Sequence, residues 1–140
     1  MNKTDLARGF QVPHDRALGI EVIEIESTHA LVRLPYDTKL VGNPDNGILH
    51  GGAITALLDT CSGTSVFAAL TAWVPIATLD LRIDYLRPAE PGKDVFARAT
   101  CYKITNNVAF TRAVAYHDRE DDPIASSAGT FMLATKPGKS

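Results

Sequence analysis

One stretch of the chain combines a histidine, two glycines and an aspartate, residue types that suit hydrolytic chemistry. His50, Gly51 and Gly52 follow a turn-rich loop and open a long, uncharged helical segment that carries a single acid, Asp59. Backbone N–H groups at the start of a helix have no partner inside the helix, so they can stabilise a developing negative charge. A carboxylate in an otherwise apolar helix is costly to bury unless it is paired or used. The pattern predicts a site that stabilises an oxyanion and activates water.

The spacing of His50 and Asp59 limits how one chain can use both. Nine residues along a helix correspond to a separation on the order of 13 Å, which is too far for both side chains to reach one bond. A symmetric dimer that packs this helix antiparallel to its copy would bring Asp59 of one chain towards His50 of the other. The sequence therefore predicts either a site shared between two chains or two unrelated roles.

The order of the periodic segments predicts an α+β fold with an antiparallel sheet. Two strands are expected first, over residues 18–26 and 30–34, followed by a loop over 36–49 that is rich in Asp, Asn, Gly and Pro. The long helix comes next. Four more strands are expected over residues 78–85, 94–102, 108–117 and 124–133. In the first of these four, alternation places Thr78 on one face and the following residues on the other: Leu79, Leu81, Ile83 and Tyr85.

The length and composition predict one globular domain over residues 1–140. Its N-terminal segment, 1–17, is expected to be peripheral with a short helix over 1–10, and its tail, 136–140, to be frayed. Hydrophobic residues make up 45% and charged residues 21%, which argues against disorder and against membrane insertion. The net charge of -2 gives no electrostatic basis for binding nucleic acid. No signal peptide is recognisable, so a cytoplasmic location is expected.

Other residue patterns exclude several classes of site. No HExxH motif, paired CxxC motif or glycine-rich phosphate loop is present in the sequence, so no metal or cofactor is predicted. Cys61 and Cys101 lie in apolar segments and are expected to be buried free thiols. Ser65 lacks the final glycine of a nucleophile elbow, which argues against a serine hydrolase. The histidines outside the motif are expected at the surface: His14, His29 and His117.

The long helix is expected to have no face suited to water. One face is apolar at helical spacing and carries Ile54, Leu57, Leu58, Cys61, Ser65 and Ala68. A second face is dominated by small residues and carries Gly52, Ala56, Asp59, Gly63, Val66 and Leu70. We expect the sheet to cover the first face and a second copy of the chain to cover the second. The alternative is a core helix with a tolerated glycine and one acid at a solvent gap.

Two segments resemble the hotdog-fold acyl-CoA thioesterases of the phenylacetate-pathway (PaaI-like) type. They are GNPDNGILHGGAITALLDT, which begins at Gly42, and TLDLRIDYLRPAEPGKDV, which begins at Thr78. The similarity extends from about Leu18 to Leu133 and includes the order of the elements. It implies a long helix wrapped by a curved antiparallel sheet, and a homodimer with two shared active sites that commonly pairs into a dimer of dimers. It also implies hydrolysis of acyl-CoA thioesters to free acid and CoA.

The resemblance assigns roles to four residues that match the family motif. Asp59 matches the catalytic carboxylate, which acts as a general base on water or as a direct nucleophile. Gly51 matches the glycine whose backbone N–H polarises the thioester carbonyl. His50 matches the histidine that orients the site and assists the leaving thiolate. Thr78 falls where relatives have a serine or threonine that positions the water.

One family residue has no direct counterpart. The family asparagine six residues before the histidine is replaced here by Pro44, and Asn43 and Asn46 flank it. A one-residue shift of the loop would let Asn43 serve, so Asn43, Asn46 or neither takes that role. Arg82 and Arg87 are candidate contacts for coenzyme A phosphates, with pairing to a neighbouring acid as the alternative.

Two other functions compete with hydrolysis. A hotdog dehydratase or hydratase would also act on acyl thioesters, but such enzymes usually pair a histidine with an acid in a different motif. A non-catalytic acyl-CoA-binding module would have no need of Asp59. The identity of the acyl group depends on packing across subunits at four residues: Leu58, Phe67, Trp73 and Tyr85.

Overall fold

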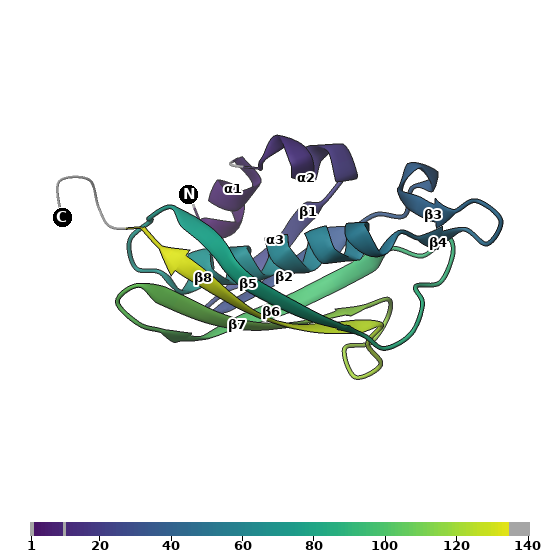
Figure 1. Cartoon of the computed structure of the whole chain (residues 1–140). Helices are drawn as coiled ribbons and strands as arrows, with labels where there is room; N and C mark the ends of the chain where they lie inside the picture. The colour runs from purple at the N-terminus through teal and green to yellow at the C-terminus, as the bar shows by residue number, and fades with distance from the viewer. Residues whose placement is uncertain (1, 10, 135–140) are drawn as a thin grey trace.

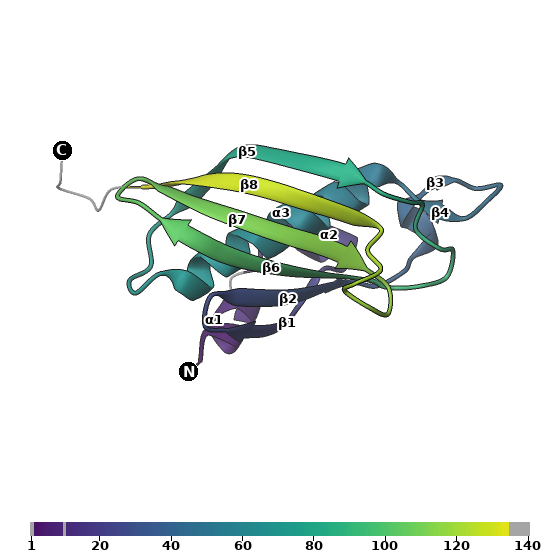
Figure 2. The ribbon, with the colours of Figure 1, turned by 90° about the horizontal axis from the view of Figure 1, so that it is seen from below.

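A six-stranded antiparallel sheet curves around one long helix, α3 (Gly51–Ala69), in the computed structural model of the chain (Figure 1). The structure describes residues 2–9 and 11–134, so the predicted frayed tail at 136–140 lies outside the described residues. The strands follow the spatial order β1-β2-β6-β7-β8-β5 and pass beneath α3 (Figure 2). The expected α+β arrangement is confirmed. The six strands are β1 (Glu21–Glu26), β2 (His29–Leu34), β5 (Ile76–Tyr85), β6 (Val95–Ile104), β7 (Val108–Tyr116) and β8 (Ala125–Leu133).

Elements that were not predicted lie before α3. The expected loop over 36–49 contains a short 3-10 helix, η1 (Thr38–Leu40), and a ribbon of two strands, β3 (Val41–Asn43) and β4 (Ile48–Leu49). The first strand begins later than expected because a second helix, α2 (Pro13–Leu18), occupies the preceding residues. Proline suits the first position of a helix, and Gly19 ends α2 in the left-handed conformation with φ 80°.

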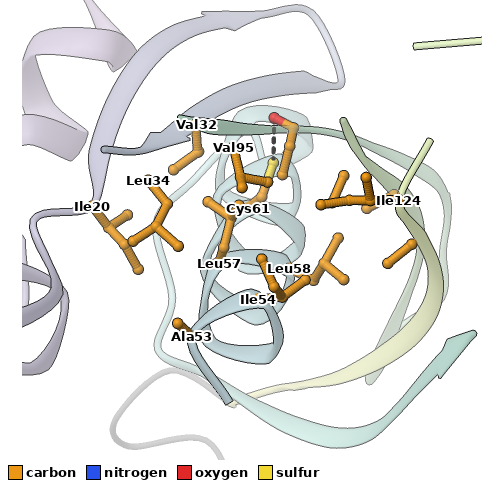
Figure 3. Packing of buried hydrophobic residues seen from close by; sticks show 14 of the residues in the cluster. Ile20, Val32, Leu34, Ala53, Ile54, Leu57, Leu58, Cys61, Val95 and Ile124 are labelled. Carbon is orange, nitrogen blue, oxygen red and sulfur yellow. Dashed lines mark hydrogen bonds between the residues drawn. The ribbon is translucent and has the colours of Figure 1, made fainter. Parts of the chain in front are cut away.

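The apolar face of α3 is buried against the sheet, as expected (Figure 3). Leu57 and Leu58 have no exposed surface, and fully burying such a side chain stabilises a fold by about 1.5–3 kcal/mol. Alanines on β6 and β7 line the buried side of the sheet and let the helix approach it closely: Ala97, Ala99, Ala113 and Ala115.

The two cysteines are buried free thiols, as expected. The Cys61 thiol donates weak hydrogen bonds to the carbonyl oxygens of Ala30 (3.4 Å) and Ala97 (3.3 Å), which links α3 to β2 and β6. Burial raises the pKa of the Cys61 thiol, so it stays protonated and unreactive. Burial also raises the pKa of Cys101.

A β-bulge changes the face on which Thr78 lies. Thr78 pairs with Phe131 of β8 and Asp80 pairs with Thr130, so Leu79 is the extra residue between them. The predicted alternation is therefore wrong at this point. Thr78 therefore shares the face that looks toward α3 with Leu81, Ile83 and Tyr85, while Leu79 is 51% exposed. The period of two fails because a bulge inserts one residue without a partner.

The N-terminal segment is tied to both α3 and the sheet. The expected first helix is α1 (Lys3–Gly9), and α1 has no buried residue. The Arg8 guanidinium donates to the Val22 carbonyl oxygen of β1 (2.9 Å). The Lys3 ammonium donates to carbonyl oxygens at the end of α3, where backbone acceptors lack helical partners: those of Phe67 (3.2 Å), Ala68 (2.5 Å) and Leu70 (2.8 Å). Gln11, Val12 and Asp15 also line the pocket described below, so this part of the segment contributes to the candidate site.

Candidate active site

Asp59 lies on the half-buried face of α3, at the wall of a pocket of about 300 Å³. The Thr78 hydroxyl donates a hydrogen bond of 2.8 Å to Asp59 Oδ1. The bulge at Leu79 makes this contact possible, because it turns Thr78 toward the helix. We call Asp59, Thr78 and this pocket the Asp59 half-site. One carboxylate oxygen is held by Thr78, which leaves the other for a water molecule or a substrate carbonyl carbon.

The pocket of the Asp59 half-site has mainly apolar walls. They come from α1, the connections on either side of α2, β1, α3, the connection after α3, and the two strands β5 and β8. The apolar lining comprises Ala7, Val12, Ile20, Val22, Phe67, Trp73, Ile76 and Phe131. Phe67 and Trp73 are two of the four residues whose packing across subunits was expected to decide the acyl group, and both line this pocket. A space of this size and character suits a hydrocarbon chain.

His50 caps the N-terminus of α3. Its backbone is extended (φ -60°, ψ 137°), and its Nδ1 accepts a hydrogen bond of 2.8 Å from the Gly52 N–H. The ring proton is therefore on Nε2, which is free to donate. A Cβ atom at Gly52 would lie 2.9 Å from Nδ1, so only glycine leaves room for this cap. The His50 N–H donates to the Leu40 carbonyl oxygen (2.8 Å), which ties the helix start to η1.

Gly51 is the first residue of α3 and is exposed. Its N–H has no acceptor inside the helix and lies at the positive end of the helix dipole. Its carbonyl oxygen accepts hydrogen bonds from the Tyr85 hydroxyl (2.9 Å) and the Thr55 hydroxyl (3.1 Å). We call His50, Gly51 and Tyr85 the Gly51 half-site. Sequence reasoning named Tyr85 only among the residues whose packing decides the acyl group, and its contact with Gly51 had no signal in the sequence.

The two half-sites are separated along α3 within one chain. His50 precedes the first turn and Asp59 lies nine residues further on, roughly 13 Å at 1.5 Å per residue. No hydrogen bond joins the two half-sites in the described part of the chain. One chain therefore supplies a carboxylate with its pocket and, elsewhere, a helix N-terminus with its capping histidine.

Asn43 and Asn46 both shape the turn that leads to His50. Asn43 Oδ1 accepts from the Asp45 N–H (2.9 Å), and the Asn43 carbonyl oxygen accepts from the Asn46 N–H (3.2 Å) and the Gly47 N–H (3.0 Å). Asn46 Oδ1 accepts from the Ile48 N–H (2.9 Å). Both side-chain oxygens thus bond backbone within the turn.

The two candidate arginines lie in different surroundings. Arg82 is on β5 with its side chain 75% exposed, 3.4 Å from Asp84 Oδ1. Arg87 follows β5 and lines a second pocket, of about 420 Å³, together with Gly51. Its guanidinium donates to the Asp122 carbonyl oxygen (3.0 Å) and lies 3.3 Å from the Asp122 carboxylate.

Asp15 is a residue of the Asp59 half-site that sequence reasoning missed. It belongs to α2, is only 8% exposed, and lines the same pocket as Asp59. Its Oδ1 accepts a hydrogen bond from the Thr60 hydroxyl (2.8 Å). Burial raises the pKa of Asp15, while the Thr60 hydrogen bond opposes that shift. Nothing in the local sequence distinguishes Asp15 from an exposed acid of a short helix.

The prediction that His117 lies at the surface is wrong. His117 is 5% exposed, its Nε2 accepts from the Glu90 N–H (2.9 Å), and its Nδ1 bonds the Asp94 carbonyl oxygen (2.8 Å). It therefore ties the connection between β5 and β6 to the end of β7.

Within residues 2–9 and 11–134, no group of three or more His, Cys, Asp or Glu side chains could hold a metal ion. None of the helices in the described ranges is long and apolar enough to cross a membrane.

Comparisons with known proteins show the family and the fold of the chain. The sequence profile of the thioesterase superfamily matches residues 46–124. The medium/long-chain acyl-CoA thioesterase YigI of Escherichia coli K12 is 34% identical over 137 residues, covering 89% of this chain and 87% of YigI. A Pseudomonas aeruginosa protein of known crystal structure is 44% identical, with a TM-score of 0.87 over 95% of this chain and all of that one. The Escherichia coli PaaI protein shares the fold, with a TM-score of 0.81 at 19% identity over 95% of this chain and 92% of PaaI.

Proposed function

Because the chain belongs to the thioesterase superfamily, we propose that it hydrolyses acyl-CoA thioesters to free acid and CoA. The observation that carries this proposal is the hydrogen bond from Thr78 to Asp59 at the wall of an apolar pocket. It supplies an oriented carboxylate beside a space that suits an acyl chain. The similarity to YigI supports a medium or long aliphatic chain as the acyl group.

The chemistry assigns a separate task to each half-site. Attack on the thioester carbonyl builds negative charge on its oxygen, and the Gly51 N–H at the start of α3 stabilises that charge. Asp59 takes the proton of the attacking water, or attacks the carbonyl itself and forms an anhydride that water then cleaves. Collapse of the intermediate releases the CoA thiolate, to which His50 Nε2 can donate a hydrogen bond. Single turnover in ¹⁸O-labelled water tests the anhydride route. If water attacks the Asp59 carboxyl carbon of the anhydride, the label enters Asp59 and the acid is released unlabelled, whereas direct attack of water on the thioester labels the acid.

Both tasks meet at one bond only if two chains combine. β5 is an edge strand of ten residues, and it leaves three large apolar side chains exposed at or just beyond it: Leu79 (51%), Tyr85 (53%) and Leu86 (55%). An unpaired strand of this length is a ready template for pairing with a second chain. Antiparallel pairing of β5 with its copy about a two-fold axis would set the two α3 helices side by side. Asp59 of one subunit would then approach Gly51 of the other.

A further association of dimers needs a second surface. Tyr102 and Met132 are each 49% exposed on the sheet and alternate with buried residues that face α3. We infer that this outer face is where a dimer of dimers would form.

Arg87 is the better placed of the two arginines for contact with CoA. It shares a pocket with Gly51, the residue that must contact the thioester carbonyl, whereas Arg82 projects from the sheet edge. Asn43 and Asn46 act on the site through the turn that positions His50. Both assignments extend the proposed function and depend on it.

Release of free thiol from acyl-CoA tests the central proposal. Asp59→Asn keeps the size of the side chain and its hydrogen bond with Thr78 but cannot take a proton, so we expect kcat to fall about 10²- to 10⁴-fold. Asp118→Asn is the matched control, because Asp118 is an exposed acid whose ion pair with Lys93 contributes little. A folded Asp59→Asn protein with the turnover of the control would refute the proposal. Consumption of an enoyl-CoA without release of thiol would indicate a hydratase. Binding of acyl-CoA without any turnover would indicate the non-catalytic acyl-CoA-binding module.

Subunit complementation tests the shared site. Chains carrying His50→Ala and chains carrying Asp59→Asn, each inactive alone, are co-expressed with different tags. A heterodimer then has one site with both lesions and one with neither, so random pairing should restore about a quarter of the wild-type activity, by symmetry. If each site lay within one chain, every site would carry a lesion and confirmed heterodimers would stay inactive.

A further inference from the structure

Asp15 is an unusual component for a pocket that would hold a hydrocarbon chain. Asp15 belongs to α2 and is only 8% exposed. It lines the same pocket wall as Asp59 and Thr60. A buried carboxyl group is costly unless its oxygens are hydrogen-bonded. An aliphatic side chain of similar size would fill the same volume without that cost.

The hydrogen bonds of Asp15 leave one oxygen available. In the described part of the chain, Thr60 supplies the one side-chain donor to the Asp15 carboxyl group, at Oδ1. The same part of the chain places no basic side chain within 4.0 Å of it. Oδ2 therefore has the capacity to accept a further hydrogen bond from a group that enters the pocket.

The position of Asp15 indicates which part of the substrate it meets. Thr60 follows Asp59 directly on α3, its hydroxyl is hydrogen-bonded to Asp15, and both acids line the same pocket. The Asp15 carboxyl group is thus near the reacting carbonyl rather than at a remote end of the acyl chain. A donor that reaches it must be attached within the first few carbons from the thioester.

We propose that Asp15 determines acyl specificity by accepting a hydrogen bond from a hydroxyl group that the acyl chain carries close to its thioester. The inference rests on the proposed thioesterase function and adds the substrate class. A 3-hydroxyacyl chain presents such a donor to Oδ2. An unsubstituted chain leaves Oδ2 without a partner, and a polar pocket group that loses its partner discriminates against that substrate.

The test compares octanoyl-CoA, 3-hydroxyoctanoyl-CoA and 8-hydroxyoctanoyl-CoA by thiol release. For the wild type we expect kcat/KM for the 3-hydroxy substrate to exceed that for octanoyl-CoA by about 10-fold or more, as for a hydrogen bond to a charged acceptor. The 8-hydroxy substrate, whose hydroxyl is remote from the thioester, should show no such advantage. Asp15→Leu should abolish the preference and improve the use of octanoyl-CoA, whereas Asp118→Leu should retain the wild-type ratio.

The ratio of two substrates separates specificity from general damage. A variant that merely packs badly would lose activity on all three substrates together, so the ratio of kcat/KM for the 3-hydroxy substrate to that for octanoyl-CoA would not change. The same ratio is measured for Asp15→Asn, which keeps the shape of the side chain but not its charge. An unchanged preference in both Asp15 variants, or no preference in the wild type, would overturn the inference while leaving hydrolysis intact. No thiol release from any substrate would instead refute the proposed function.

Discussion

The Gly51 N–H can be removed without deforming the helix that presents it. Proline lacks an N–H and is well tolerated at the first position of a helix, which is where Gly51 lies. The residue before a proline must be extended, and His50 already is, with φ -60° and ψ 137°. A Cβ at position 51 would lie 3.5 Å from the Tyr85 hydroxyl oxygen, an ordinary contact. Gly51→Pro therefore deletes one donor, and Gly51→Ala is its matched control.

The expected loss follows from the role of that donor. Removing one oxyanion donor typically lowers kcat about 10²- to 10³-fold, or roughly 2.7–4 kcal/mol of transition-state stabilisation. We expect this loss in Gly51→Pro and not in Gly51→Ala, because alanine keeps the N–H. The measurement is the rate of thiol release at saturating octanoyl-CoA, with circular dichroism and sedimentation to establish that both variants fold and associate alike. A folded Gly51→Pro protein with the kcat of Gly51→Ala would refute the assignment of Gly51 as the oxyanion donor.

Two further predictions concern side chains at the other half-site. Thr78→Val removes the hydrogen bond to Asp59 and should lower kcat/KM about 10- to 100-fold, whereas Thr78→Ser should retain activity; equal activities of the two variants would contradict the role of the hydroxyl. The raised pKa of Asp15 means that the folded chain binds this proton more tightly than the unfolded chain, so the stability associated with Asp15 is present at low pH and is lost as pH rises through the folded pKa. Asp15→Asn should therefore gain unfolding free energy relative to the wild type at pH 7 but not at pH 4, as measured by urea denaturation at both pH values. A variant that is equally stable relative to the wild type at both pH values would contradict the raised pKa.

The sequence alone determined the order of the long helix and the six strands of the main sheet, and the residue at which that helix starts. Apolar periodicity is a local property, so the strands of the second half and the long helix could be read directly. His50, Gly51 and Gly52 mark a helix N-terminus because capping depends on neighbouring residues. Asp59 stood out because no other acid interrupts the apolar helix.

Tertiary structure decided which side chains meet across the fold. The bulge at Leu79 turns Thr78 toward Asp59, and a bulge depends on strand pairing that a single strand's alternation does not reveal. Asp15 enters the pocket because α2 packs against α3, and two short segments distant in sequence carry no mark of that contact. His117 is buried for the same reason, since its partners come from the connection between β5 and β6. Local sequence specifies the elements, whereas burial and contact between distant elements depend on how the whole chain packs.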